Sequence, residues 1–218
     1  MVDAAHRAWL RLGRDVLAQA ARLASGRRVG AAAPGAARAP GPSPPAGLEP
    51  CLGRRSQPRC KKGGAEAGPN PVDRARPGTK HHLLVDAAGV PLAALLSAAN
   101  RNDSKLLEPL LDAVRPVKTG RRGRPRQRPA KLHADKGYDH AFCRRLCRAR
   151  GIKARIARRG IESSAKLGRH RWVVERTFAW LARYRRLAVR YERRADIHLA
   201  FLTLGCALIC FNYLQRQL

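Results

Sequence analysis

The pattern of apolar and polar residues predicts short β-strands in four stretches of the chain: residues 81–85, 90–96, 131–135 and 152–157. Each stretch is an apolar or alternating run that is bounded by Gly, Pro or charged residues, as is typical of strands. The first two are separated by a turn that contains Asp86 and Gly89, and such turn residues favour a hairpin.

Helical spacing of apolar residues alternates with these strands. One helix is predicted to start at Asn102 or Asp103, with the four leucines of residues 106–111 facing inward. A second helix runs to Gly151, and two long helices are predicted at 171–186 and 194–216. This order of elements indicates an α/β layered domain, in which functional residues gather at the carboxyl ends of strands.

The first part of the chain has a different texture. Residues 1–65 are rich in Ala, Pro, Gly and Arg, and apart from a loose helical pattern at residues 4–23 they show no apolar periodicity. Such a segment buries too little apolar surface to offset the entropy of ordering it. We therefore predict a largely disordered region at 1–65 and a folded domain at 66–218.

The charge of the chain indicates a polyanionic partner. Lys and Arg number 45 against 15 Asp and Glu, which gives a formal net charge of +30. Nucleic acid is the usual partner of so basic a protein, although codon usage in a GC-rich genome also favours Arg, Ala, Gly and Pro. The basic stretch 115–131 offers Arg121, Arg122, Arg124 and Arg126 for contacts with DNA phosphates; the alternative is a solvated loop.

Neither secretion nor a membrane is indicated. The N-terminus carries charges throughout, and the apolar run at 199–214 is shorter than the ~20 residues that span a bilayer. We expect a cytoplasmic protein in which this run is a buried core helix. Four of the six cysteines form two pairs at helical i, i+4 spacing, which predicts small core residues and no zinc site.

Two acidic residues are placed where a functional site is expected. Asp135 follows a predicted strand directly, and Glu175 is the only acid in the predicted helix 171–186. Carboxylates clustered in a basic protein are suited to bind Mg²⁺, which promotes phosphoryl transfer on nucleic acid. For Glu175 the alternative is an ion pair with Arg171 within the helix.

Several ordered blocks of this chain resemble the DDE transposases of bacterial insertion sequences, in particular the insertion-sequence-five family. The blocks include "GGAEAGPNPVDR", "NRNDSKLLEPLLDAV", "LHADKGYD" and "RWVVERTFAWLARYRRL" and cover about residues 61–214. The resemblance implies an RNase H-like fold and metal-dependent cutting and joining of DNA. The implied partners are Mg²⁺, for which Mn²⁺ can substitute, and the terminal repeats of the insertion element; a homodimer is left open. It also implies a bacterial, nucleoid-associated protein.

The family's catalytic carboxylates are Asp, Asp and Glu, and two of them match this chain. Asp135 falls on the second Asp, in a block completed by Gly137 and Tyr138, and Glu175 falls on the Glu, with Arg171 four residues earlier. The basic residue that the family has after its Glu falls on Ala182, next to Arg183, which is our candidate for DNA contact there.

The family's first Asp has no counterpart here. The alignment of motifs places Arg54 where that acid belongs and Ser56 where the following Ser belongs. We therefore expect a frame-shifted or partial copy whose domain lacks its first strand. Two functions follow from this: a transposase of doubtful activity, or a non-catalytic DNA-binding remnant that regulates or inhibits an intact transposase.

Other polar residues of the domain have structural interpretations. Asp86 is expected in the hairpin turn, Asp73 in a turn or beside an arginine, and Asp103 at a helix cap. Because side chains alternate along a strand, at most one of His81 and His82 should face inward. Trp172 and Trp180 are expected in the core.

Overall fold

A computed structural model describes residues 51–54, 58–116, 128–158 and 164–215, with side chains described from residue 58 onward and, in the long helix after residue 163, from Trp172 onward. The predictions for residues 1–50, which include the disorder and the loose helix at 4–23, concern residues that the structure does not describe.

The described strands form one mixed eight-stranded sheet. In chain order they are β1 (Cys51–Arg54), β2 (Arg59–Cys60), β3 (Gly68–Pro69), β4 (Pro77–Val85), β5 (Pro91–Ala98), β6 (Lys131–Ala134), β7 (Lys153–Ile156) and β8 (Val189–Arg190). β4 is the longest and pairs antiparallel with β1, β2, β3 and β5. β6 is parallel both to β1 and to β7, so the main part of the sheet reads β5-β4-β1-β6-β7.

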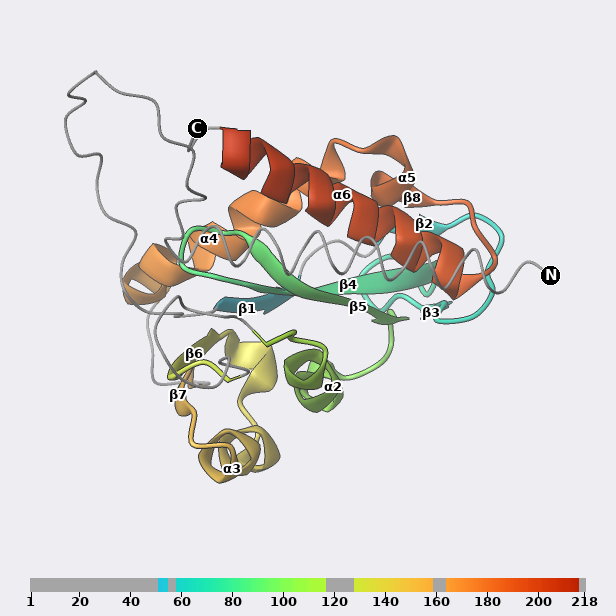
Figure 1. Cartoon of the computed structure of the whole chain (residues 1–218). Helices are drawn as coiled ribbons and strands as arrows, with labels where there is room; N and C mark the ends of the chain where they lie inside the picture. The colour runs from blue at the N-terminus through green and yellow to red at the C-terminus, as the bar shows by residue number, and fades with distance from the viewer. Residues whose placement is uncertain (1–50, 55–57, 117–127, 159–163, 216–218) are drawn as a thin grey trace, which may run out of the picture.

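Helices connect and cover the strands. Two 3₁₀ turns, η1 (Asp103–Leu106) and η2 (Lys136–Tyr138), precede α2 (Leu107–Asp112) and α3 (Ala141–Ala149). The second half of the chain adds α4 (Ser164–Ala182), α5 (Arg185–Ala188) and α6 (Ala195–Gln215). α4 and α6 lie on one face of the sheet, and α2 and α3 lie on the other (Figure 1).

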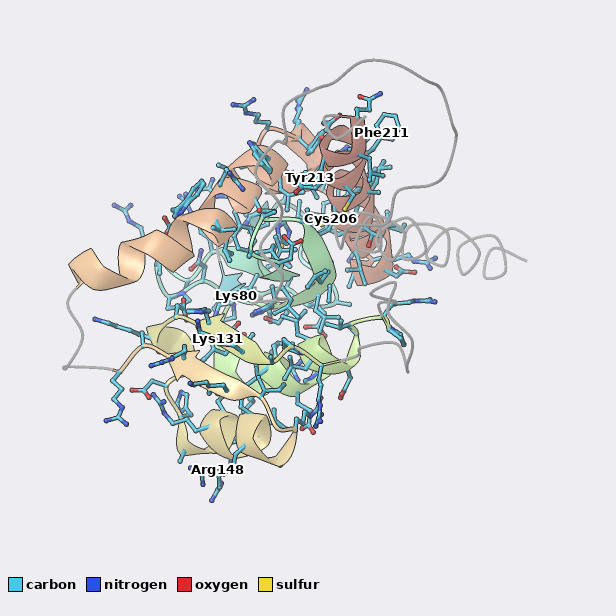
Figure 2. The ribbon with its side chains drawn as sticks, turned by 60° about the vertical axis from the view of Figure 1, so that its left-hand side comes forward. Lys80, Lys131, Arg148, Cys206, Phe211 and Tyr213 are labelled. Atoms are coloured by element: carbon cyan, nitrogen blue, oxygen red, sulfur yellow. The ribbon has the colours of Figure 1, made fainter. Side chains whose placement is uncertain are left out.

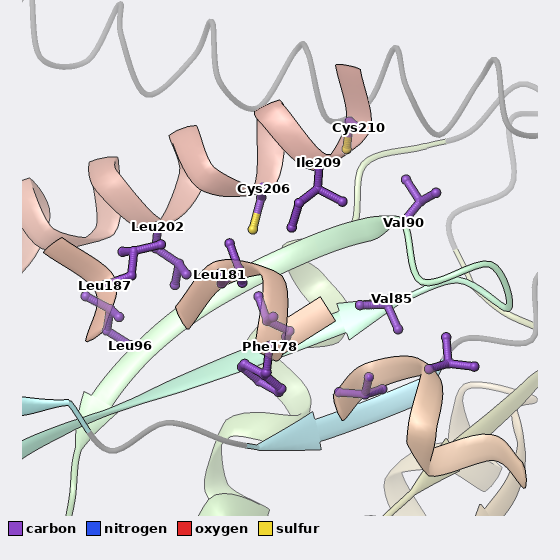
Figure 3. Close-up of a cluster of buried hydrophobic side chains, with 13 residues drawn as sticks. Val85, Val90, Leu96, Phe178, Leu181, Leu187, Leu202, Cys206, Ile209 and Cys210 are labelled. Carbon is purple, nitrogen blue, oxygen red and sulfur yellow. The ribbon is translucent and has the colours of Figure 1, made fainter. Parts of the chain in front are cut away.

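Each face of the sheet has its own apolar core. Leu83, Val85 and Leu96 pack against Phe178 and Leu202 on the face covered by α4 and α6 (Figure 3). Leu84 and Ala93 pack on the opposite face against residues of α2 and α3. Because both faces are covered, alternation along β4 buries every residue from Gly78 to Val85. The prediction that at most one of His81 and His82 faces inward is therefore wrong: both are buried.

The elements predicted from apolar periodicity are confirmed, whereas the short strands β1, β2, β3 and β8 were not predicted. The helix predicted at 171–186 begins earlier, at Ser164, and ends at Ala182, before the separate helix α5. Contrary to the expected missing first strand, residues 51–54 form β1 in the middle of the sheet, between β4 and β6. β1 and β2 both precede residue 66, so the sheet extends further toward the N-terminus than the predicted boundary.

Four cysteines confirm their predicted role as core residues. Cys143 and Cys147 of α3 and Cys206 and Cys210 of α6 are all fully buried, and burial raises the pKa of each thiol. α6 spans 21 residues and is long and apolar enough to cross a membrane by length and composition. Its buried residues nevertheless pack in the apolar core on one face of the sheet, as predicted.

Candidate active site

Asp135 lies where β6 ends, at the start of η2. Its side chain accepts a hydrogen bond of 2.9 Å from the backbone N–H of Gly137, so Asp135 is the N-terminal cap of that turn. Parallel pairing of β1 with β6 matches Leu52 to Ala134, which brings the last residues of β1 beside Asp135. Asp135 is half-buried, as suits a side chain that must remain accessible to a ligand.

A pocket of about 520 Å³ opens beside Asp135. It is lined by the loop after β5, the start of η1 and the β6–η2 junction, together with Pro71 and Lys80 of β4. The polar and charged members of this lining are Lys80, Asn100, Arg101, Asn102, Asp103, Asp135 and Lys136. A volume of this order is typical of ligand sites in proteins.

Gly137 is enclosed between two carboxylates. A Cβ atom added to it would lie 3.0 Å from Asp135 Oδ1 and 3.1 Å from Asp103 Oδ2. These distances are shorter than ordinary van der Waals contact. A side chain at position 137, two residues after Asp135, would therefore require Asp103 or the candidate catalytic carboxylate to shift by a few tenths of an ångström.

Asp103 has a different role from the predicted helix cap. The cap of η1 is Asn102, whose side chain accepts from the Ser104 N–H. Asp103 is buried and forms an ion pair of 3.0 Å with Lys80 of β4. The sequence offered one signal that was missed: a lysine in the middle of a buried strand requires an acidic partner, because an unpaired buried charge is costly.

Glu175 lies on α4, the helix that packs against β1 and β4. The turn of α4 that carries it is anchored to the β4–β5 hairpin: Arg176 Nη2 donates to Ala88 O, and Thr177 Oγ1 donates to Gly89 O at 2.9 Å. Val85, at the end of β4 next to that hairpin turn, pairs with Cys51, the first residue of β1. Glu175 is exposed. β1 lies next to the helix that carries Glu175 and also next to β6, which ends at Asp135.

The two tryptophans of α4 flank an arginine. The guanidinium carbon of Arg176 lies 4.4 Å from the centroid of Trp172 and 4.9 Å from that of Trp180. Trp172 is 49 % exposed, so its predicted place in the core is wrong, and Trp180 is half-buried. Stacking of this kind fixes the guanidinium that binds the hairpin.

No acid stands beside Asp135 on β1. The two residues at its carboxyl end are Gly53 and Arg54, and Arg54 pairs with His82. Within the part of the chain that the structure describes, no group of three or more His, Cys, Asp or Glu side chains is arranged to hold a metal ion.

The basic candidates fall mainly outside the described part of the chain. Arg121, Arg122, Arg124 and Arg126 belong to residues 117–127, which are not described, and the side chain of Arg171 is likewise outside the described residues. Arg183 is described and is exposed just after the end of α4.

Asp86 and Asp73 have the structural roles predicted for them. Asp86 Oδ1 accepts from Ala88 N and Val90 N at 2.9 and 2.8 Å and so closes the β4–β5 turn. Its burial raises its pKa above the usual range. Asp73 pairs with Arg59 at 3.4 Å, which confirms its expected arginine partner.

A second buried polar cluster lies on the other face of β4. His81 Nε2 is 2.9 Å from Nε2 of His198 in α6, and His198 Nδ1 is 3.2 Å from a carboxylate oxygen of Glu192. Fully buried Arg190 bonds Thr79 Oγ1 at 2.6 Å and the backbone carbonyls of Ala65, Glu66, Glu192 and Arg193. Burial, helped by neighbouring His198, lowers the pKa of His81 to about 3.

Comparison with known proteins gives two matches. Residues 53–210 match the family model described as the transposase DDE domain. A protein of Burkholderia cepacia, assigned as the transposase of insertion sequence element IS402, is 54 % identical to this chain over 207 residues, which cover 95 % of the chain and 98 % of that protein. A match of this extent includes most of the first 65 residues of this chain.

Proposed function

The chain belongs to the DDE transposases of insertion sequences, and on this premise we propose that Asp135 and Glu175 are its catalytic carboxylates, acting on the DNA ends of its own element. The topology supports this proposal. β6 ends at Asp135 beside the carboxyl end of β1, and the helix that carries Glu175 packs on β1. One four-residue strand thus lies next to both elements, although the two side chains are forty positions apart in the sequence.

The strand order supports an RNase H-like assignment of the domain. The central strand β1 is flanked by antiparallel β4 on one side and by parallel β6 on the other. In layered α/β sheets, functional residues lie at the carboxyl ends of the strands. Asp135 occupies such an end.

The family implies a divalent metal ion, and the chemical kind of the two side chains suits one. Carboxylate oxygens are the ligands that Mg²⁺ prefers, and Mg²⁺ is commonly held by one or two carboxylates with water and substrate phosphates. Asp135 and Glu175 would hold it, and it would supply charge stabilisation at the phosphate that reacts. The residues of the chain itself then have two tasks: the Gly137 N–H orients Asp135, and the Arg176 and Thr177 bonds fix the helix of Glu175.

DNA binding follows from the family and is supported by the charge of the chain. At a net charge of +30, contacts with phosphates dominate the affinity, which then falls steeply as salt increases. The arginines of residues 121–126, Arg171 and Arg183 are the proposed contacts. The protein is expected to act in the cytoplasm, where its DNA lies.

The test is cleavage of element-end DNA in Mg²⁺ by the wild-type chain and by Asp135→Ala and Glu175→Ala. We expect each variant to lose about 10³-fold or more in rate, because several kcal/mol of transition-state stabilisation depend on metal held by these groups. Asp73→Ala is the matched control, since it removes a half-buried carboxylate that pairs with Arg59 and does not line the pocket. Equal rates for Asp135→Ala and wild type would remove the catalytic assignment.

A second function is favoured by one observation: β1 ends in Arg54, which the alignment of motifs places where the family's first Asp is expected. A chain that binds element ends but does not cut them would act as a remnant that competes with an intact transposase. Binding to the same DNA, with no nicking in either Mg²⁺ or Mn²⁺ by the wild-type chain, is the result that would establish this function over the first.

A further inference from the structure

Lys80 and Asp103 form a buried ion pair at the edge of the sheet where Asp135 lies. Their side chains are only 6 % and 4 % exposed, and the ammonium lies 3.0 Å from Asp103 Oδ1. The same ammonium donates to the backbone carbonyl of Arg101 at 2.7 Å. Lys80 lies between the two helix layers, whereas Arg148 of α3 projects from the surface (Figure 2). The pair therefore ties β4 to the loop after β5 and to η1.

The free-energy balance of such a pair argues for a role in geometry. Removing two charges from water costs several kcal/mol for each, and well-packed apolar residues often replace a buried pair without loss of stability. A buried pair is thus weak evidence for stabilisation. What it does provide is a fixed direction: Lys80 holds one oxygen of Asp103, and this determines where the other oxygen lies.

That other oxygen lies against the turn that contains Asp135. Asp103 Oδ2 is 3.1 Å from the position that a Cβ atom of Gly137 would take, and Asp135 Oδ1 is 3.0 Å from the same position. The N–H of Gly137 donates to Asp135 Oδ1 at 2.9 Å. Gly137 is thus enclosed between Asp103 and Asp135, and η1 contacts η2 here.

We propose that the Lys80–Asp103 pair is the positioning element of the site: it holds the Gly137 peptide in place, and the Gly137 N–H in turn orients the carboxylate of Asp135 toward its metal ion. Neither residue touches the reacting atoms, so both act through Gly137. This inference rests on the proposed role of Asp135. Lys80 and Asp103 are 23 positions apart in the sequence, and neither is one of the two proposed catalytic carboxylates.

The first measurement follows the Gly137 amide itself, without metal or DNA. In full-length protein labelled with ¹⁵N-glycine, Asp103→Ala should shift the Gly137 amide proton upfield and speed its hydrogen exchange about tenfold, because the hydrogen bond to Asp135 is weakened. Asp103→Asn keeps the shape and one acceptor for Lys80, so it should retain most of the wild-type shift. Leu110→Ala is the control: it opens a cavity in the core at α2, destabilises the fold and should leave the Gly137 signal unchanged.

The second measurement is Mn²⁺ affinity, followed by the electron paramagnetic resonance of free Mn²⁺. Loss of a residue that orients a metal ligand typically weakens affinity by about 10- to 100-fold, and we expect this of Asp103→Ala and of Lys80→Met. Asp103→Asn should lie between these variants and wild type, and Leu110→Ala should bind as wild type does.

The outcomes separate the two proposals. A Gly137 signal and a Mn²⁺ affinity that are the same in Asp103→Ala, Lys80→Met and Leu110→Ala would overturn the positioning role, even if Asp135→Ala abolishes Mn²⁺ binding. A shifted Gly137 signal in a protein whose Mn²⁺ binding does not depend on Asp135 would keep the positioning role and remove the proposed function. If Asp103→Ala does not fold, Asp103→Asn and Lys80→Met take its place. A wild-type Mn²⁺ affinity in Asp103→Asn together with a wild-type Gly137 signal in Lys80→Met would overturn the inference.

Discussion

The two faces of β4 carry two buried polar clusters that differ in one respect. Thr79 and His81 point to the side of α6, where they meet Arg190 and His198. Lys80 and His82 point to the opposite side, where they meet Asp103 and Ser97. The first cluster is closed, because fully buried Arg190 is surrounded by protein acceptors. The second cluster borders the pocket beside Asp135.

This difference indicates how one strand can serve stability on one face and a site on the other. Arg190 joins the loop at Ala65 and Glu66 to the loop at Glu192 and Arg193, so its contacts are a permanent part of the fold. Lys80 has a single carboxylate and one carbonyl as acceptors, and its partner borders a space that a ligand can enter. We therefore expect substitutions on the α6 face to change stability and substitutions on the pocket face to change the site.

The largest effect is expected from Arg190→Met. This variant removes all hydrogen bonds of a buried guanidinium while keeping an apolar side chain in its place, and should lower the free energy of unfolding by about 3–4 kcal/mol. Urea unfolding measures it, with exposed Arg185→Met as the control. If both variants lose less than about 1 kcal/mol, the closed cluster is not the stabilising one and the comparison of the two faces fails.

A smaller effect is expected from acid. The pKa of His81 is about 3 in the folded protein and 6.5 in the unfolded chain, so the unfolded state takes up a proton first as the pH falls. Stability is therefore unaffected above the unfolded value and decreases between pH 6.5 and pH 3, by about 2 kcal/mol at pH 5. His81→Gln should flatten this dependence. An unchanged pH dependence in His81→Gln would place the acid sensitivity elsewhere.

The smallest effect is expected on the pocket face, from Ser97→Ala. His82 Nε2 lies 2.8 Å from Ser97 Oγ, and loss of one such hydrogen bond costs about 1 kcal/mol. Thermal unfolding of Ser97→Ala compared with that of the wild-type chain measures this loss. A loss as large as that of Arg190→Met would mean that both faces serve stability equally.

Most elements were predictable because their apolar periodicity is local. β4, β5, β6 and β7 each follow from a run of apolar residues, and Gly151 ends α3 with a φ of +64° that only glycine adopts easily. β1 was not predictable in this way. Its four residues, Cys51–Arg54, lie among prolines and arginines, and its strand conformation depends on pairing with β4 and β6, which are distant in the sequence.

The candidate site was predictable only in part. Asp135 was found because a scarce acid follows a strand, and Gly137 because it belongs to a family motif. The partnership of Lys80 with Asp103 was missed because it connects two segments that only the fold brings together. Burial of both His81 and His82 was missed for a similar reason: alternation along a strand gives two faces, but not how many of them are covered.

The short length of β1 divides the sheet into two parts with a narrow junction. Among the described strands, β6 and β7 are connected to the rest of the sheet through β1 alone, and β6 pairs with β1 at two residue pairs. The part of the sheet that carries Asp135 is therefore joined to the part that supports α4 and α6 only through β1. Bending of the sheet at Cys51–Arg54 would alter the distance between Asp135 and the helix that carries Glu175.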